Sequence, residues 1–565
     1  MSKHLNVVIV GAGFAGLVAA RELGAAGHRV QILEARDRIG GRTWTAHQLG
    51  CDLELGGTWI HWLQPHVWAE VTRYQRKLVR SPVAAHAYWI AGGKLNKGTP
   101  EELEERGARA HEAVVAGSRE LFPQPHEVLA EFGDDAVREK FLALDRQTVQ
   151  DRLAAAGLSQ EEIDLADAFW TACFNGSSAT GSATMPLQWF ALAGHDFTLL
   201  NETTLAYKLA GGMRSLYERI AADVTGEIRL NTRVESVAYR ADGVTVGVAG
   251  GQLLEADAVI VTAPVAALRG VAFDPPLADA EAGLIATGLN STGLKLWAKV
   301  RGHRSFIAQA PSGHALTFAW PEYYLDDDTS ILVGFGPDAG ALDGNDASAV
   351  QSALREWIPD IEVVASVSHD WVADPLAGQT WATFRPGQLA GGWAALRRPH
   401  GRLLFAGGDY AAGWAGFVDG AVQSGLDAAA TVRSWAADSA AASATTTRED
   451  TMMTAVPKST IAPQSWVPFL VGDQPAGEVH WLRVEERPHG TLATGIWRIG
   501  PEEGACLPYA VQGSETIQVL EGEAELDVPG GEVIRLGPGD IISLPDGFTA
   551  TWRTLSPFKK FFVVA

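Results

Sequence analysis

The sequence predicts an α/β fold built on a parallel sheet, followed by a small all-β unit. Three observations lead to this prediction. A buried strand, a glycine-rich turn and a helix open the chain between residues 7 and 26. Apolar residues at helical spacing fill a long segment from about 102 to 192. After about residue 466, short strand-like runs alternate with Gly, Pro and Asp turns.

The bulk composition is that of a globular enzyme. The 565 residues suggest three or four domains, and 47% are apolar while 20% are charged. A net charge of −22 disfavours nucleic acid and anionic lipid and favours cationic small molecules. The three cysteines, Cys51, Cys173 and Cys506, support neither a disulfide framework nor a cysteine metal site, which suits a reducing cytoplasm. No secretion signal and no run of 18 apolar residues is evident, so we expect a cytoplasmic protein with no membrane partner.

The first element is a βαβ unit. Residues 7–10 read as a buried strand, residues 17–26 as a helix and residues 30–33 as a second strand. Between them, Gly11 allows a tight turn, Gly13 lets a pyrophosphate approach the backbone, and Gly16 lets the helix pack on the strand. Glu34 ends the second strand, where a carboxylate accepts hydrogen bonds from ribose hydroxyls and repels a 2′-phosphate. The unit therefore predicts a dinucleotide site that disfavours NADP.

A second phosphate-binding patch follows at once. In the run from Glu34 to Arg42, two glycines expose backbone N–H groups and Arg36 and Arg42 supply permanent positive charge. A site for nicotinamide alone does not need this patch.

These motifs resemble the flavin amine oxidase family of monoamine and polyamine oxidases, over roughly residues 5 to 435. The resemblance extends to the runs from Glu54 to Trp59, from Leu209 to Met213 and from Phe405 to Asp409. The family usually has glutamate where Asp409 stands; Asp409 is expected to accept a hydrogen bond from the ribityl chain, with a helix N-cap as the alternative. The resemblance implies bound FAD, held by Gly11, Gly13, Ala15, Gly16, Glu34, Ala35, Arg36, Gly40, Gly41, Arg42, Gly56, Gly57, Thr58, Trp59, Val234, Gly408, Asp409, Phe417 and Val418.

The resemblance also implies the domain plan. A Rossmann-type FAD-binding domain is assembled from residues 1–85, 205–285 and 390–435, and an α+β substrate domain from 86–204 and 286–389. By composition, the Ala-, Ser- and Thr-rich stretch 436–463 is expected to be a mobile linker, and 464–565 a separate all-β domain.

Lys295 is the first candidate catalytic residue. It lies in an apolar strand-like run from Ser291 to Trp297, where an unpaired lysine would be costly to bury. In the resembled family this position holds a water against flavin N5, which implies support of flavin reduction or of the reaction with oxygen. The alternative is an edge-strand lysine that reaches solvent.

Two aromatic residues are the other catalytic candidates. The resembled family flanks the substrate nitrogen with two rings whose π faces stabilise developing positive charge. In this chain Trp381 and Phe417 take those places, although the family more often has tyrosine there and core packing is the ordinary fate of an aromatic residue. Animal monoamine oxidases attach FAD through a cysteine immediately before the first ring; Thr380 stands there, so we predict non-covalent FAD.

The implied reaction is oxidation of a small-molecule amine to an imine that hydrolyses, with oxygen reduced to hydrogen peroxide. An amino-acid oxidase or desaturase of the same fold, a dehydrogenase with another electron acceptor and a flavin-bound ligand sensor remain as alternatives. A carboxylate substrate would need a facing arginine, and near the two rings only Arg385 is available. Residues expected to line the substrate cavity are Phe174, Asn175, Gln188, Trp189, Phe318 and Trp320.

The last hundred residues resemble a cupin barrel of the ureidoglycine aminohydrolase-like type. Glycines and a proline support the match, namely Gly504, Gly522, Gly539, Pro545 and Gly547. Metal-binding cupins have histidines where this chain has Ala510, Gln512 and Ala550, and only Glu515 of the usual ligands remains. We therefore predict a barrel with no metal that serves as a dimerisation or ligand-binding unit, and His480 and His489 are expected at the surface.

Overall fold

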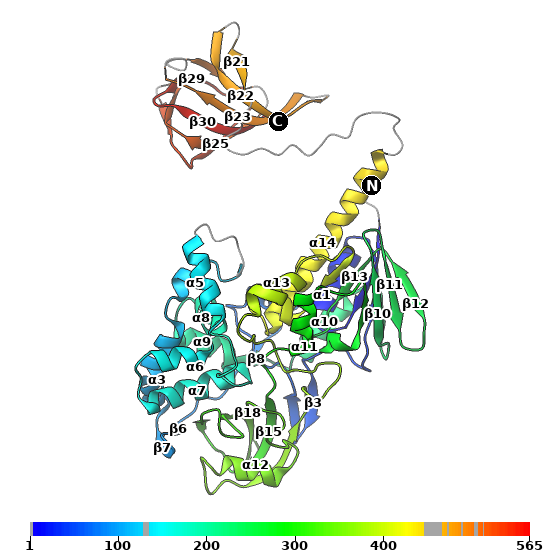
Figure 1. Cartoon of the computed structure of the whole chain (residues 1–565), viewed down its shortest axis with the longest axis vertical. Coiled ribbons are helices and arrows are strands. Elements are labelled where there is room, and N and C mark those ends of the chain that lie inside the picture. Colours follow the sequence, from blue (N-terminus) through cyan, green and yellow to red (C-terminus); the bar gives the residue numbers. More distant parts are fainter. Residues whose placement is uncertain are drawn as a thin grey trace. The chain divides into compact units, whose positions relative to one another are not determined.

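The computed structural model describes residues 4–127, 135–445, 466–471, 474–487, 490–501, 507–511, 514–530 and 532–564. The chain divides into two compact units, residues 1–447 and 448–565 (Figure 1), and each is described by itself. Within these described ranges no helix is long and apolar enough to cross a lipid bilayer.

A five-stranded parallel sheet forms the base of the first unit. Its strands, in order across the sheet, are β20 (Leu403–Phe405), β13 (Ala258–Val261), β1 (Asn6–Val10), β2 (Arg29–Leu33) and β9 (Glu227–Arg229). The predicted α/β fold is confirmed, since β1, helix α1 (Phe14–Ala25) and β2 form the expected βαβ unit. Residues 7–10 are buried because both faces of a parallel sheet are covered by other elements.

Helix α14 (Val418–Thr445) packs against α1, and the side chains of Val422, Ala429 and Val432 join the same core as Leu17. The helix continues ten residues into the segment 436–463 that we expected to be a linker. Alanine has the highest helix propensity, so an Ala-rich run prolongs a helix that has already been nucleated. The remainder of that segment lies outside the described residues.

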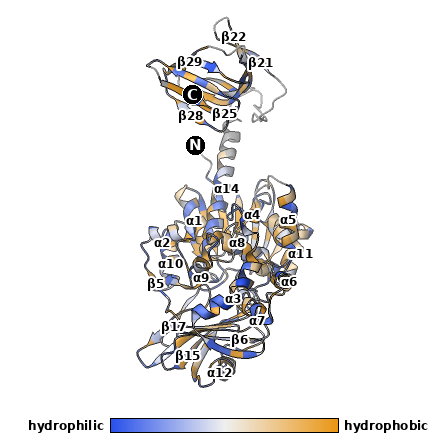
Figure 2. Cartoon of the chain, turned by 90° about the vertical axis from the view of Figure 1, so that its left-hand side faces the viewer, coloured by the Kyte–Doolittle hydropathy of each residue, from blue (hydrophilic) through white to orange (hydrophobic). Residues whose placement is uncertain are grey.

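The second layer of this unit is a seven-stranded sheet with a cluster of helices beside it (Figure 1). The strands, in order, are β19 (Val363–Ser368), β15 (Leu294–Arg301), β18 (Thr329–Gly336), β17 (Phe318–Leu325), β16 (Phe306–Gln309), β6 (His86–Ala91) and β7 (Lys94–Gly98). The helices are α3 (Pro100–Val115), α4 (Ser118–Leu121), α5 (Asp135–Asp145), α6 (Val149–Ala155), α7 (Gln160–Phe174), α8 (Thr184–Leu192) and α9 (Phe197–Leu205). Figure 2 shows hydrophilic residues on α3 and hydrophobic ones around α8, which is buried along almost its whole length.

Smaller elements complete the unit. A four-stranded sheet contains β12 (Leu253–Ala256), β11 (Val244–Val248), β10 (Val234–Tyr239) and β14 (Ala272–Asp274). Two ribbons pair β3 (Thr45–Gln48) with β4 (Cys51–Glu54) and β5 (Leu78–Arg80) with β8 (Tyr207–Leu209). The other α-helices are α2 (Pro65–Arg73), α10 (Arg214–Ala222), α11 (Asp279–Thr287), α12 (Ala347–Leu354) and α13 (Ala394–Leu396).

The second unit is a barrel of two antiparallel sheets around one apolar core that includes Trp497, Ile517, Leu526, Trp552 and Phe558. One sheet orders β21 (Val467–Val471), β22 (Gln474–Arg487), β23 (Gly490–Ile499), β30 (Phe558–Val564), β25 (Glu515–Glu521) and β28 (Ile541–Leu544). The other orders β24 (Leu507–Ala510), β29 (Thr549–Thr554), β26 (Ala524–Val528) and β27 (Glu532–Leu536). The predicted all-β C-terminal unit is confirmed.

Candidate active site

One cavity of about 800 Å³ opens into the first unit, and its wall contains most of the predicted cofactor residues. Those that line it are Gly11, Gly13, Ala15, Glu34, Ala35, Arg36, Gly40, Gly41, Arg42, Gly56, Gly57, Thr58, Trp59, Val234, Gly408, Phe417 and Val418. Gly16 and Asp409 do not line it. The cavity therefore joins segments that lie more than 400 residues apart in the sequence, from Gly11 to Val418.

The glycine turn leaves a cradle of the kind a dinucleotide needs. A Cβ on Gly16 would lie 2.1 Å from the Gly11 carbonyl oxygen, so this position serves close packing of α1 on β1. A Cβ on Gly13 would meet nothing nearer than the Gly41 Cα at 3.9 Å, so the backbone here borders open cavity. These residues fit a pyrophosphate at the N-terminus of α1.

Glu34 stands at the ribose position of the same cradle. Its two carboxylate oxygens accept hydrogen bonds from the backbone N–H groups of Ala12 at 2.7 Å and Arg36 at 2.8 Å. A carboxylate has about four acceptor positions, so acceptor capacity remains toward the cavity that Glu34 lines. These acceptor positions fit the ribose hydroxyls of FAD, which would donate to them.

Asp409 differs from the expectation that it contacts the ribityl chain. Its carboxylate is fully buried and accepts from the Arg42 guanidinium, the Val265 backbone N–H at 2.9 Å and the Gln379 side-chain amide at 3.0 Å. One methylene shorter than glutamate, it stays behind the cavity wall. Asp409 therefore orients Arg42, which also donates to the Thr380 carbonyl at 3.0 Å and does line the cavity.

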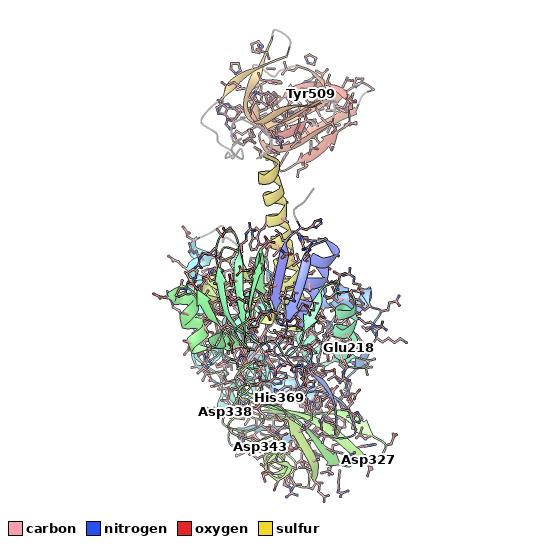
Figure 3. The ribbon with its side chains drawn as sticks, turned by 90° about the vertical axis from the view of Figure 1, so that its right-hand side faces the viewer. Glu218, Asp327, Asp338, Asp343, His369 and Tyr509 are labelled. Atoms are coloured by element: carbon pink, nitrogen blue, oxygen red, sulfur yellow. The ribbon has the colours of Figure 1, made fainter. Side chains whose placement is uncertain are left out.

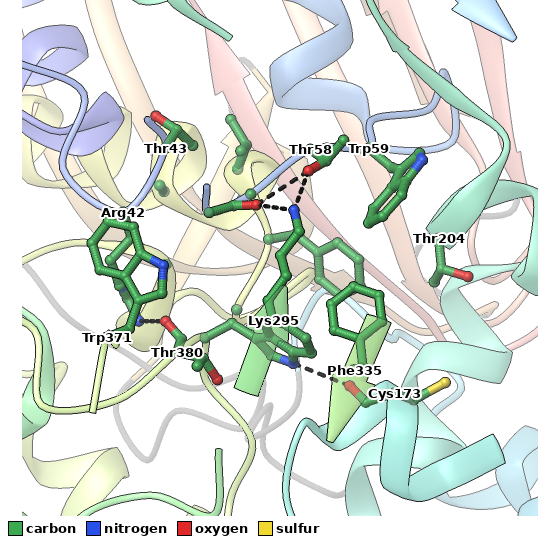
Figure 4. A pocket seen from close by; sticks show the side chains of 18 of the residues that line it. Arg42, Thr43, Thr58, Trp59, Cys173, Thr204, Lys295, Phe335, Trp371 and Thr380 are labelled. Atoms are coloured by element: carbon green, nitrogen blue, oxygen red, sulfur yellow. Dashed lines mark hydrogen bonds between the residues drawn. The ribbon is translucent and has the colours of Figure 1, made fainter. Parts of the chain in front are cut away.

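Lys295 lies on β15 with its side chain buried and its amino group in the cavity wall (Figure 4). Nζ donates to the Glu54 carbonyl at 2.9 Å, the Gly56 carbonyl at 2.6 Å and the Thr58 hydroxyl at 2.5 Å. Burial lowers the pKa of the Lys295 amino group to about 7, against the carboxylates of Glu54 and Glu322, which raise it. The amino group is therefore held by neutral oxygens and changes its charge near neutral pH.

The two rings that are predicted to flank the substrate nitrogen, Trp381 and Phe417, both line the cavity. We call this pair the cage. The Trp381 indole N–H donates to the Cys173 carbonyl at 3.0 Å, and its ring lies edge-on to Phe335 at 5.9 Å. The Phe417 ring lies edge-on to Trp189 at 6.1 Å and to Trp414 at 5.1 Å. Neighbouring rings thus fix the orientation of both candidates, and their role in binding an amine stays a prediction.

The six residues expected to line the substrate cavity divide equally. Trp189, Phe318 and Trp320 line it, whereas Phe174, Asn175 and Gln188 do not. Phe174 is fully buried, with its ring 5.7 Å from that of Trp189. The Asn175 amide donates to the carbonyls of Leu294 and Gly336, and the Gln188 amide to those of Pro125, Ala412 and Gly413. Buried amides take backbone partners, so these two side chains tie segments together rather than face a ligand.

Several cavity residues were not foreseen. They are aromatic or imidazole groups from the helices and from β18, namely His111, Phe169, Trp170, Phe197 and Phe335. A signal for His111 existed, because it continues the i, i+4 spacing of Leu103 and Gly107 on the apolar face of α3. Its ring lies 4.8 Å from Phe169 and 6.1 Å from Trp170.

In the barrel, the Glu515 carboxylate pairs with a buried cation. Its carboxylate accepts from Lys560 Nζ at 2.9 Å and from the Tyr509 hydroxyl (Tyr509 is labelled in Figure 3). Lys560 is buried, 5.0 Å from the ring centroids of both Tyr509 and Trp552. In the described part of the chain no group of three His, Cys, Asp or Glu side chains is placed to hold a metal; a barrel with no metal stays a prediction. Cys506, Gly504, Gln512 and His489 lie outside the described residues.

Comparison with known proteins gives two family matches. The profile described as flavin containing amine oxidoreductase matches residues 14–433, and that of the EutQ-like cupin domain matches residues 486–562. The chain is 32% identical to nicotine dehydrogenase of Pseudomonas putida, over 76% of this chain and 88% of that protein. It is 30% identical to pseudooxynicotine dehydrogenase of a Pseudomonas species, over 76% and 86%. The structure of wild-type putrescine oxidase bound to putrescine superposes with a TM-score of 0.66 at 23% identity, over 77% of this chain and 100% of that one.

Proposed function

The chain belongs to the flavin-containing amine oxidoreductase family, and we propose that it oxidises a small amine at FAD held in the cavity of about 800 Å³. The observation that carries the proposal is the meeting of Lys295, Trp381 and Phe417 with the dinucleotide cradle in one cavity wall. When bound, FAD accepts a hydride equivalent from the α-carbon of the amine, and the resulting imine hydrolyses to a carbonyl compound and ammonia or a smaller amine.

The residues of the chain position the substrate and exclude water. Trp381, Phe417 and Phe335 line the cavity, and the π face of an aromatic ring favours an amine that develops positive charge. Lys295 Nζ, between the Gly56 carbonyl and the Thr58 hydroxyl, holds its proton below about pH 7 and releases it above. The proposed role of this group is to hold a water beside the flavin.

Arg385 does not line this cavity, which supports an amine over a carboxylate substrate. It lies instead beside a separate hollow with Leu284 and Gly392. Arg80 does line the main cavity, but its side chain is exposed and stacks near the Tyr207 ring at 5.9 Å.

Oxygen is the proposed electron acceptor, with hydrogen peroxide as the product. A second candidate function, amine dehydrogenation with another acceptor, is favoured by the names of the two relatives at 30% and 32% identity, which are both called dehydrogenases. The substrates in their names lead us to include nicotine and pseudooxynicotine in the amine panel.

Anaerobic bleaching of the flavin with that panel tests the proposal. Amines should bleach the absorbance within seconds to minutes while amino acids do not. If no amine bleaches the flavin, the proposed function is wrong. Admitting air then separates the two acceptors, because an oxidase recovers its absorbance quickly with release of peroxide and a dehydrogenase recovers slowly.

Non-covalent FAD is part of the proposal. Thr380, which precedes the first cage ring, has a side chain unable to form the thioether that a cysteine provides. Acid precipitation should therefore leave the flavin absorbance in the supernatant, and colour retained in the pellet would contradict this.

The barrel is proposed as a homodimerisation unit. Its outer strand β21 and the neighbouring β22 expose apolar side chains, including Val467, Leu470, Trp481 and Val484. Exposed apolar edge strands favour pairing with another chain. Light scattering on the full chain should give twice the 60.2 kDa monomer mass, and a monomer at micromolar concentration would refute it.

A further inference from the structure

One part of the cavity wall is formed by a cluster that has no role in the proposed chemistry. We name it the distal subsite, consisting of His111 on α3, Phe169 and Trp170 on α7, and Phe197 on α9. Trp170 lies three residues before Cys173, whose carbonyl accepts the Trp381 indole N–H. At 1.5 Å per residue, the subsite begins about 5 Å along α7 from the cage.

The distal subsite contains buried polar atoms that the protein leaves without partners. Trp170 is fully buried, and no acceptor for its indole N–H is found anywhere in the described ranges. His111 Nδ1 is buried and likewise unmatched among the residues that have been placed. Other buried indoles divide into two groups: Trp297 donates to the Glu54 carbonyl at 2.9 Å and Trp393 to the Asp409 carbonyl at 2.7 Å. Within the described ranges no partner is found for the indole N–H groups of Trp189 and Trp320, which also line this cavity, or for that of Trp89, which does not. Unpaired buried donors are unfavourable, so such atoms in a cavity wall point to a ligand that pairs with them.

The chemistry of these atoms indicates which ligand group fits. An indole N–H only donates, and a neutral imidazole offers one donor and one acceptor. Burial lowers the pKa of His111 to about 4, so its ring is uncharged at neutral pH. A second ammonium group has only donors to offer and would face the Trp170 N–H.

The carboxylates that border the same cavity do not change the preference of this cluster for a neutral hydrogen-bond acceptor. Glu104 and Glu112 on α3 are exposed, and Glu202 is half-buried beside Tyr207. They lie where solvent reaches them, and favour the approach of a cationic amine rather than pairing with a group inside the aromatic cluster.

We propose that the distal subsite selects amines that carry a neutral hydrogen-bond acceptor, such as a pyridine nitrogen or a carbonyl or hydroxyl oxygen, bound by Trp170 and His111. The acceptor stands about one helical turn or more beyond the reacting nitrogen. This inference rests on the proposed amine oxidation and names the substrate class of that site.

The test compares two amines that differ by one ring atom. 3-(Pyridin-3-yl)propylamine and 3-phenylpropylamine have the same shape, and only the first carries an acceptor. We expect anaerobic flavin reduction of the wild type to favour the pyridyl amine by about tenfold in the apparent second-order rate constant, the usual effect of one buried hydrogen bond. Trp170→Phe and His111→Phe keep a ring but remove the partner atoms, and each should lower this preference to about threefold or less.

The preference is a ratio within each variant, so a change in flavin content or stability does not imitate it. Trp62→Phe is the matched control, because Trp62 is 42% exposed and does not line the cavity, and this variant should keep the wild-type ratio. A ratio near one in the wild type, an unchanged ratio in both distal variants, or faster reduction by 1,5-diaminopentane overturns the subsite while leaving amine oxidation intact. Absence of bleaching by every amine overturns both proposals.

Discussion

Replacing Lys295 with methionine should change how the stability of the first unit depends on pH. The folded protein holds the Lys295 amino group at a pKa of about 7, whereas an unfolded lysine titrates near 10.5. Between these values the unfolded chain binds the extra proton, so the free energy of unfolding rises with pH by about 1.4 kcal/mol per unit. The cost of burying the ammonium is complete below pH 7 and disappears above 10.5.

From pH 7 to pH 9 this linkage amounts to about 2 kcal/mol, because the group is already half neutral at the lower pH. The wild type should gain that amount relative to Lys295→Met, which has no titrating group there. Urea unfolding followed by release of flavin fluorescence measures the difference for the unit that holds FAD.

Lys299→Met provides the control on the same strand. Lys299 pairs at 2.7 Å with Asp327, whose side chain is 56% exposed and lies at the outer end of the sheet (Figure 3). This variant should follow the wild type at each pH. A constant difference between wild type and Lys295→Met from pH 7 to pH 9 would refute the argument. So would a pH dependence in Lys299→Met that differs from that of the wild type as much as the pH dependence of Lys295→Met does.

Three further predictions concern the cofactor cradle and the cage. Gly16→Ala should yield no folded flavoprotein, since its Cβ would lie 2.1 Å from the Gly11 carbonyl oxygen, whereas Gly13→Ala should fold but bind FAD at least about tenfold more weakly, as flavin titration of the apoprotein would show. Arg42→Met removes the partner of the buried Asp409 carboxylate and should lower the free energy of unfolding of the unit by about 3 kcal/mol. An unchanged unfolding midpoint would contradict a stabilising role for the Arg42–Asp409 ion pair. Trp381→Phe keeps a ring but loses the bond to the Cys173 carbonyl, so kcat/KM should fall by about three- to tenfold, against about 100-fold for Trp381→Ala; equal losses would show that the ring itself is unimportant.

Sequence patterns predicted those parts of the fold and of the site that depend on a short continuous segment. The strand, turn and helix from residue 6 to 25 and the cradle residues Gly13 and Glu34 follow from backbone requirements that a short segment displays. The same reasoning placed Lys295 on a buried strand. It did not reveal that its partners are the oxygens of residues 54, 56 and 58, because these come from a turn more than 230 residues away.

The errors share a physical cause. Helical spacing marks Phe174 and Gln188 as buried, but burial against a core and burial against a cavity produce the same pattern. Asp409 was assigned to the cofactor, yet its acceptors are used by Arg42, Val265 and Gln379, whose meeting depends on the whole tertiary fold. His111 and Trp170 were missed because an unpaired buried nitrogen becomes visible only when every neighbour has been placed.

The strand order of the parallel sheet has a consequence for biosynthesis. Strand β13 has β1 on one side and β20 on the other, and β20 is not translated until residues 403–405. A nascent chain therefore emerges from the ribosome with one edge of β13 unpaired while all the intervening residues are made, and open strand edges invite aggregation. Any fragment that stops before residue 405 keeps this edge and also lacks Gly408 and Phe417, so the wall of the flavin cavity is incomplete until these residues have been added.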